Sequence, residues 1–118
     1  MQRAHPDHNL ISSERVRDTA VFSTSGEQIG TIDHMMIEKI GGKVSYAVMS
    51  FGGFLGIGHN HYPIPWSALK YDTNLGGYVT GITEQQLQNA PAFSDDSYGN
   101  RAWEERVHQH YGVMPYYV

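Results

Sequence analysis

One segment, residues 43–51 (KVSYAVMSF), constrains the fold more than any other, because apolar side chains fill both of its alternating sets of positions. Side chains of a β-strand alternate between the two faces of the sheet. The two sets are Val44, Tyr46 and Val48 on one face and Ala47, Met49 and Phe51 on the other. A strand that is apolar on both faces has to be covered on both. A small sheet closed on itself covers one face, so the other face needs either the C-terminal tail or another subunit.

Turn residues divide the rest of the chain into short strands and helices. Further strands are expected at residues 19–24, 29–40, 70–72 and 77–81. Gly41-Gly42 predicts a two-residue hairpin turn before the most apolar strand. Helical segments are expected after Ser12 or Ser13, at residues 65–69, after an N-cap at Thr83 with Gln86 at the N3 position, and at residues 100–111 before Gly112. In the last helix, Trp103, Val107 and Tyr111 form one apolar stripe.

Composition narrows the class of protein. The chain has 118 residues, 40% of them apolar and 17% charged, which is typical of one globular domain. Its net charge of −4 excludes general DNA binding and disfavours RNA, because both depend on cations that displace phosphate counterions. No cysteine is present, so no disulfide, thiolate metal site or cysteine nucleophile is expected. The longest nearly apolar run, residues 48–57, is too short to span a membrane and no signal peptide is visible, so a cytoplasmic location is expected.

A family resemblance is carried by glycines and apolar residues spread over two hairpins and the loop that follows them. The residues are Gly26, Ile29, Gly30, Ile32, Asp33, Gly42, Lys43, Tyr46, Val48, Gly52, Gly53, Leu55, Gly56, Pro65 and Trp66. Over about residues 16–87 this pattern resembles the PRC-barrel family, found in the photosynthetic reaction-centre H subunit, in a ribosome maturation factor and in stand-alone bacterial proteins. The resemblance implies an all-β fold: a small antiparallel barrel of about six strands with short helices, followed by a C-terminal helical tail. It also implies docking on protein partners, and it carries over no catalytic residue.

The resemblance suggests three segments. Residues 1–15 are expected to form an N-terminal arm, residues 16–90 the barrel domain, and residues 91–118 a C-terminal extension with one short helix.

The stretch SFGGFLGIGHNHYPIPW (residues 50–66) raises the question of a ligand site. A phosphate loop needs glycines that lead into a helix, usually with a lysine, and this stretch leads instead to Pro63 and Pro65. His59 and His61 could share one side of a strand and bind a metal, with a third ligand from His34, Asp33 or an N-terminal histidine. The alternative is two surface histidines beside a turn. No cofactor is expected.

No catalytic constellation has support from spacing. Asp33 and His34 are adjacent, and adjacent strand residues point to opposite faces, so they are not expected to form a dyad. Asp33 is expected to accept backbone hydrogen bonds or to pair with a cation. His108 and His110 are two apart on a helix and cannot chelate one ion together.

The sequence therefore predicts a non-catalytic protein-interaction module, a homodimer that also docks on an unidentified protein. The expected interface residues are Phe54, Leu55, Ile57, Trp103, Tyr111 and Tyr116. The alternatives are an RNA- or ribosome-associated maturation factor and a factor associated with photosynthetic or electron-transfer complexes. Gly30, Asp33, Gly52, Gly53, Gly56, Pro65 and Trp66 are expected to serve the structure, with Trp66, Tyr46 and Val48 in the core.

Overall fold

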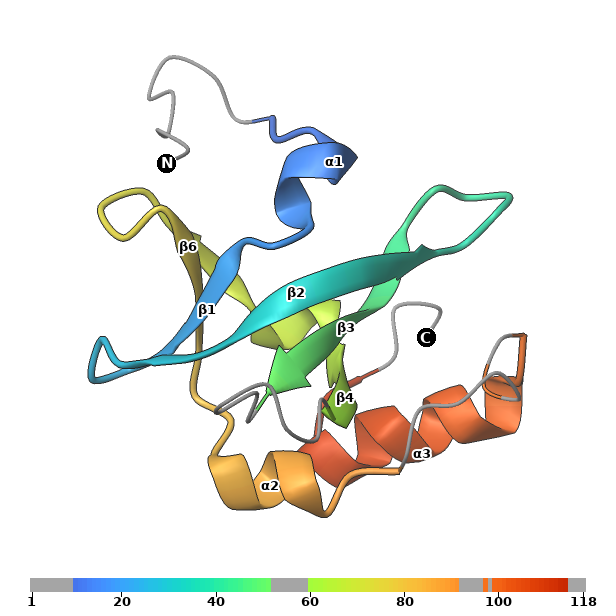
Figure 1. Ribbon diagram of the computed structural model, residues 1–118. Coiled ribbons are helices and arrows are strands. Elements are labelled where there is room, and N and C mark those ends of the chain that lie inside the picture. The colour runs from blue at the N-terminus through green and yellow to red at the C-terminus, as the bar shows by residue number, and fades with distance from the viewer. Residues whose placement is uncertain (1–9, 52–59, 92–96, 98, 115–118) are drawn as a thin grey trace.

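The computed structural model describes residues 10–51, 60–91, 97 and 99–114, and the strands in this part of the chain form one six-stranded sheet (Figure 1). The strands are β1 (Ala20–Ser23), β2 (Gln28–Ile37), β3 (Val44–Phe51), β4 (Asn60–Pro65), β5 (Lys70–Asp72) and β6 (Gly77–Thr80). The helices are α1 (Ser13–Val16), α2 (Glu84–Gln88) and α3 (Arg101–Tyr111), with a 3₁₀ turn, η2, at Trp66–Ala68. The expected all-β class, with six strands, short helices and a C-terminal helix, is confirmed.

The strand order is β4-β3-β2-β1-β6-β5, so β4 and β5 are the two edges of the hydrogen-bonded ladder in the described residues. The sheet is strongly curved (Figure 1). Only residues 66–69 lie between the end of β4 and the start of β5. A connection this short can bridge only a short distance, so the two strand ends must lie close together. The two edges therefore approach each other at this end of the molecule, which gives the sheet its barrel-like form.

One strand pair departs from the antiparallel expectation. β1 and β6 pair in parallel, with Val21 opposite Tyr78, while the other pairs are antiparallel. The cause is η2, which carries the chain from one edge strand to the other without the reversal that a hairpin turn would make. β5 consequently starts on the far edge, and its hairpin partner β6 returns alongside β1.

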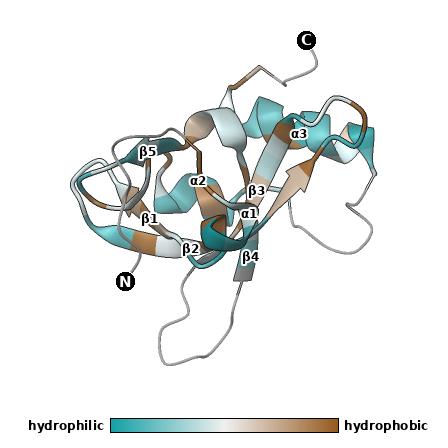
Figure 2. Cartoon of the chain, turned by 90° about the horizontal axis from the view of Figure 1, so that it is seen from above, coloured by the Kyte–Doolittle hydropathy of each residue, from teal (hydrophilic) through white to brown (hydrophobic). Residues whose placement is uncertain are grey.

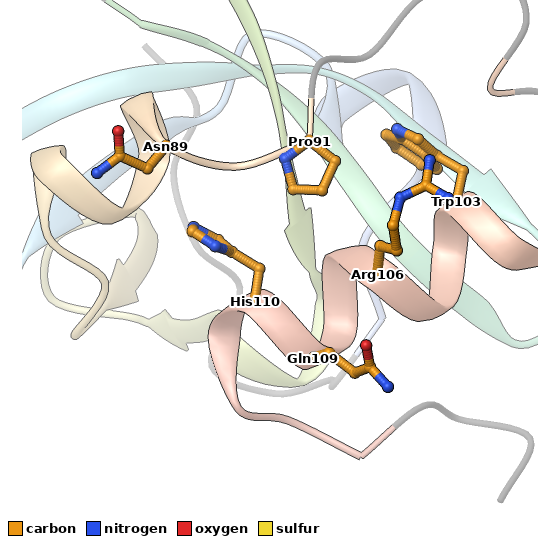
Figure 3. Close-up of a pocket in the computed structure, with 6 residues that line it drawn as sticks. All are labelled: Asn89, Pro91, Trp103, Arg106, Gln109 and His110. Carbon is orange, nitrogen blue, oxygen red and sulfur yellow. The ribbon is translucent and has the colours of Figure 1, made fainter.

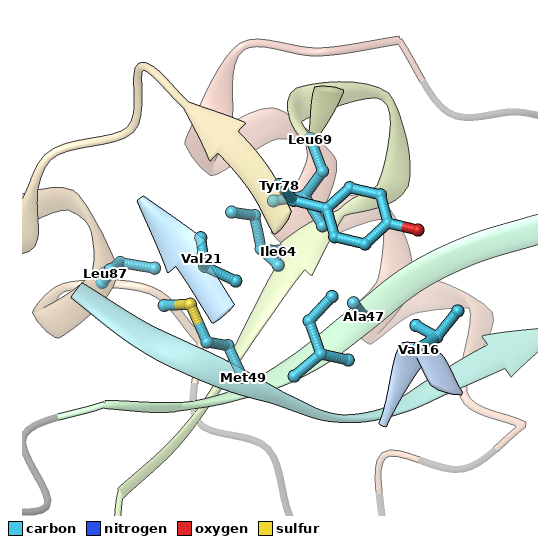
Figure 4. Packing of buried hydrophobic residues seen from close by; sticks show 9 residues of the cluster. Val16, Val21, Ala47, Met49, Ile64, Leu69, Tyr78 and Leu87 are labelled. Atoms are coloured by element: carbon cyan, nitrogen blue, oxygen red, sulfur yellow. The ribbon is translucent and has the colours of Figure 1, made fainter. Parts of the chain in front are cut away.

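The main core lies inside the curve of the sheet, and every strand except β5 contributes to it (Figure 4). Its buried residues are Val16, Val21, Ile32, Ala47, Met49, Ile64, Leu69, Tyr78 and Leu87. Trp66, which was expected in the core, is half-buried and packs against Tyr78 with ring centroids 5.3 Å apart. Val16 and Leu87 come from α1 and α2, so each short helix closes part of the same interior.

A second core lies on the opposite face of β3. Tyr46 and Val48 are buried there against Trp103 and Val107 of α3. The Tyr46 and Trp103 rings meet edge to face, with centroids 5.2 Å apart. β3 is therefore covered on both faces, as its composition predicts, and the cover of the second face is the C-terminal helix of the same chain.

Hydrogen bonds fix α3 on the sheet at both of its ends. At the first turn, Ser45 Oγ donates to Glu104 Oε2. At the last turn, Tyr111 OH donates to the carbonyl oxygen of Pro63, 2.8 Å away, on the edge strand β4. Brown and teal segments alternate along α3, as expected for a helix with one buried side (Figure 2).

Capping side chains place the helix boundaries where the sequence predicts them. Ser12 accepts from the backbone of Glu14 at the start of α1, and Thr83 forms a complete capping box with Gln86 at the start of α2. Asn100 accepts from the N–H of Trp103, 3.0 Å away, and begins α3. Gly112 ends α3 in the left-handed conformation.

β4 was not predicted as a strand, because two prolines lie within it. Pro63 and Pro65 stand opposite Val48 and Tyr46 of β3. Being two residues apart, both prolines direct their nitrogens to the same side of the strand. That side is the outer edge, where no ladder hydrogen bond is lost, so the prolines are tolerated there and nowhere more central in a sheet.

Candidate functional site

The loop between β2 and β3, residues 38–43, is built more firmly than a flexible turn. The Gly42 N–H donates to the Glu38 carbonyl at 2.9 Å, and the Glu38 N–H donates to the Lys43 carbonyl at 2.8 Å. The Glu38 carboxylate also accepts from the N–H of Gly41. The predicted two-residue turn at Gly41-Gly42 is thus wrong: β2 ends at Ile37, and a longer loop closed by Glu38 follows.

One glycine of this loop is required by the backbone. Gly42 has a φ of 75°, in the left-handed region that favours glycine. A Cβ on Gly41 would meet only the end of the flexible Glu38 side chain, so this position is less restricted. We call residues 38–43 the hairpin loop.

The hairpin loop presents an apolar side chain to solvent. Ile40 is 95% exposed and Ile37, at its base, is 50% exposed. Lys39 and Lys43 are exposed on either side of Ile40 in the sequence, while Glu38 is occupied by the backbone of the loop. The tip is thus an apolar group flanked by cations on a molecule whose net charge is −4.

A β-bulge in β2 brings Asp33 and His34 together. Ile32 pairs with Met49 and His34 with Val48, so Asp33 is an extra residue in the ladder. His34 Nδ1 donates to Asp33 Oδ2 at 2.7 Å, and each side chain is 34% exposed. The prediction that these residues point to opposite faces is therefore wrong.

The bulge explains why the alternation fails at this point. Ile32 and Met35 both contact the main core although they are three residues apart, and Met36 contacts the second core. The two residues between Ile32 and Met35 consequently share the other face. An apolar spacing of three inside a strand is a signal in the sequence that could have indicated the bulge.

A carboxylate that fixes an imidazole ring is the arrangement found in general bases. The same arrangement is also a local hydrogen bond between two side chains at an irregular point of the ladder. Within residues 10–51, 60–91, 97 and 99–114, no group of three His, Cys, Asp or Glu side chains is placed to bind a metal. His61, one of the two expected metal ligands, is exposed on the edge strand β4.

The remaining site residues from the sequence fall into two groups. Phe54, Leu55, Ile57, His59 and Tyr116, together with Gly52, Gly53 and Gly56, lie outside the described residues. Trp103 is only 5% exposed and packs on its own sheet, which leaves almost none of the indole for a second subunit. Tyr111 is half-buried and its hydroxyl is taken by Pro63. Gly30 and Pro65 are paired in strands β2 and β4.

Two tyrosines are electrostatically perturbed by the fold. Burial, and to a smaller extent the neighbouring Tyr62, raises the pKa of Tyr111. Burial also raises the pKa of Tyr78, with a smaller contribution from Tyr71. Both hydroxyls stay neutral at physiological pH, and that of Tyr111 acts as the hydrogen-bond donor to Pro63.

The sequence did not single out the hairpin loop. Its signal in the sequence is a single isoleucine, Ile40, between Lys39 and Lys43 and next to two glycines. The expected strand at residues 29–40 included this isoleucine. Periodicity assigns Ile40 to a strand, and only the carboxylate contact from Glu38 reveals a loop.

Comparison with known proteins agrees with the architecture. None of the helices in the described part of the chain combines the length and the apolar character needed to cross a membrane. A search of curated proteins found no match. The family model of the PRC-barrel domain matches residues 8–87, which is more than half of the chain and includes all six strands. The chain therefore belongs to the PRC-barrel domain family.

Proposed function

We propose that this PRC-barrel protein is a non-catalytic protein-interaction module that pairs with a second copy of itself and docks on a further protein. The observation that carries the proposal is the hairpin loop, which holds Ile40 almost fully in solvent on a backbone fixed by Glu38. A single exposed isoleucine is ordinary on a protein surface. One that is held in place by a preorganised loop suits a binding contact, because little conformational entropy is lost on docking.

The docking partner would present an apolar socket rimmed by carboxylates. Burying one isoleucine side chain contributes about 1.5–3 kcal/mol. Lys39 and Lys43 add electrostatic attraction to an acidic rim, which mainly raises the rate and the specificity of association. An anionic membrane is a poorer fit, because the chain as a whole carries a net charge of −4.

The docking proposal is tested with matched variants in a pull-down from the native host. Ile40→Asp places a charge at the tip, and Leu75→Asp makes the same change at a 43% exposed position in the β5–β6 turn. Proteins retained by the native chain and by Leu75→Asp but lost by Ile40→Asp support the proposal. Equal retention by both variants rejects the hairpin loop as the contact.

The homodimer is supported by apolar side chains that neither core uses. Met114, just after α3, is 69% exposed and Leu10 is 83% exposed. Met114 precedes the segment that contains the expected interface residue Tyr116, and Leu10 lies within the expected N-terminal arm. Light scattering at micromolar concentration tests the pairing: twice the chain mass supports it, and a strict monomer removes it.

The absence of catalysis is part of the same proposal. The Asp33–His34 pair occupies a bulge, where a side-chain hydrogen bond can compensate for the irregular ladder, and this supports a structural role. Under that role, Asp33→Asn should lower the free energy of unfolding. A hydrolase screen with chromogenic esters that found turnover, lost in Asp33→Asn, would contradict it.

A further inference from the structure

A groove lies between the end of α2 and the exposed side of α3, far along the chain from the hairpin loop (Figure 3). Its volume is about 670 Å³, within the range of about 300–1,000 Å³ that is typical of ligand sites. The lining residues are Asn89, Pro91, Trp103, Arg106, Gln109 and His110. Nothing in the proposed docking of the hairpin loop uses this groove.

The helix brings the three chemically important residues of α3 to one side. At 100° per residue, Trp103, Arg106 and His110 fall within a 60° arc of the helix surface, an arc that follows from about 3.6 residues per turn. Figure 3 shows these side chains rising from α3 on the side of Pro91 and Asn89. The groove thus combines one cation, an aromatic ring and a proline.

The wall of the groove is held in place by a hydrogen bond between two helices. His110 Nε2 donates to the carbonyl oxygen of Gln86, 2.6 Å away. This bond joins α3 to α2 and orients the imidazole ring at the end of the groove. The Asn89 side chain lies on the facing wall, just after α2, and is exposed.

Arg106 is the ordinarily charged side chain among the described residues that line the groove. Among the described lining residues there is no carboxylate. Glu104 accepts from Ser45 and lies 3.7 Å from the guanidinium of Arg101, so it is engaged on another side of α3. Arg106 is exposed, and no carboxylate of the described residues lies within ion-pair distance of it.

We propose that this groove binds an extended acidic peptide segment of a partner protein. Arg106 would bind an Asp or Glu side chain, for which the planar guanidinium is suited. The amide of Asn89 would hydrogen-bond the peptide backbone, and Pro91 would contact an apolar side chain. A nucleic acid is disfavoured, since one arginine supplies too little charge to displace phosphate counterions.

The test uses the full chain and two fluorescein-labelled synthetic peptides. One is acidic (GEIDVEG), and its twin carries amides in place of the carboxylates (GQINVQG). The acidic peptide should bind about tenfold more tightly or better than its twin, and the difference should shrink as salt is raised. Equal binding of the two peptides, or no binding up to millimolar concentration, would overturn the proposal.

Matched arginine variants locate the site. Arg106→Gln should weaken binding of the acidic peptide by about tenfold or more. Arg17→Gln, the same change at an exposed arginine beside α1, should leave binding unchanged. Arg106→Gln that binds like the native chain, with both variants folded by circular dichroism, would overturn the assignment.

Two further readouts separate the peptide from other occupants. In ¹⁵N NMR spectra the indole N–H of Trp103 should shift on titration, while that of Trp66, which packs against the main core away from the groove, should stay in place. Shifts at Trp66 alone would contradict the site. Displacement of the acidic peptide by single-stranded oligouridylate of equal length and concentration would contradict the choice of a peptide over a nucleic acid.

The groove and the hairpin loop are tested independently. Ile40 is unchanged in the groove variants, so a failed peptide test leaves the hairpin-loop proposal standing. Arg106 is unchanged in Ile40→Asp, so a failed docking test leaves the groove proposal standing.

Discussion

At the scale of single residues, Tyr111 joins α3 to the edge strand β4 through its hydroxyl group. Tyr111→Phe removes this donor and leaves the Pro63 carbonyl without it, so the free energy of unfolding should fall by about 1 kcal/mol. Urea denaturation measures the change. Tyr71→Phe is the control, because Tyr71 is 39% exposed and on the opposite edge strand; an equal loss in both variants would contradict the role of the hydrogen bond.

The same tyrosine predicts a loss of stability in alkaline solution. Burial raises the pKa of Tyr111, whereas an unfolded tyrosine has a pKa of about 10. Above about pH 10 the unfolded chain therefore releases a proton that the folded protein keeps, and the free energy of unfolding falls as pH rises. Urea titrations between about pH 8 and pH 11 should show this decline, and it should be shallower in Tyr111→Phe. An identical decline in the variant would assign the effect to other groups.

Gly30 is a second residue with a specific structural requirement. A Cβ at this position would overlap the carbonyl oxygen of Ser50 on the neighbouring strand. Gly30→Ala should therefore lower the free energy of unfolding by about 1–3 kcal/mol, measured by thermal denaturation. Gly81→Ala is the matched control, since nothing lies within 4 Å of its added Cβ, and it should change stability by less than about 0.5 kcal/mol.

At the scale of elements, α3 acts as a structural cover of β3. Trp103→Ala opens the second core beside Tyr46, and the free energy of unfolding should fall by about 3–5 kcal/mol in urea denaturation. Met114→Ala is the control, because this side chain is 69% exposed just beyond the helix and its loss should change little. A Trp103→Ala protein as stable as Met114→Ala would show that α3 does not stay on the sheet.

This role of α3 also bears on experiments with shortened chains. A chain that ends after Ala90 lacks α3 and leaves Tyr46 and Val48 uncovered. Such a chain exposes an apolar sheet face that binds other proteins non-specifically. Point variants at Arg106 or Ile40 are therefore cleaner tests of partner binding than truncation.

The sequence predicts elements well where one local pattern decides them. The two apolar faces of β3 require two covers, and the stripe of Trp103, Val107 and Tyr111 provides one of them. Caps at Thr83 and Asn100 follow from side chains that act within three residues of their own position.

Elements and sites that depend on distant partners were not predictable in this way. Pro63 and Pro65 argue against a strand until β3 is known to leave β4 at an edge. Strict alternation separates Asp33 from His34 until the register with β3 inserts an extra residue. The groove combines residues 89–91 with α3, and no sequence spacing indicates that these segments face each other.

At the scale of the whole molecule, β3 is the strand that belongs to both cores. Its residues Ala47 and Met49 face the main core, while Tyr46 and Val48 face α3. Opening β3 exposes both cores at once, so its amide hydrogens should exchange near the global unfolding limit. Hydrogen exchange followed by NMR should find the slowest amides at residues 46–49. Slower exchange in the short edge strand β5 would contradict the two-core arrangement.

The proline-bearing edge of β4 sets a limit on how the protein can polymerise. Strand-by-strand growth of a fibre needs donors and acceptors along an open edge. Pro63 and Pro65 provide no N–H there, and Tyr111 already occupies the Pro63 carbonyl. The opposite edge, β5, offers only Lys70–Asp72 as a template. Addition of a further strand is thus disfavoured at both edges of the described sheet, at β4 by the missing donors and at β5 by the shortness of the strand.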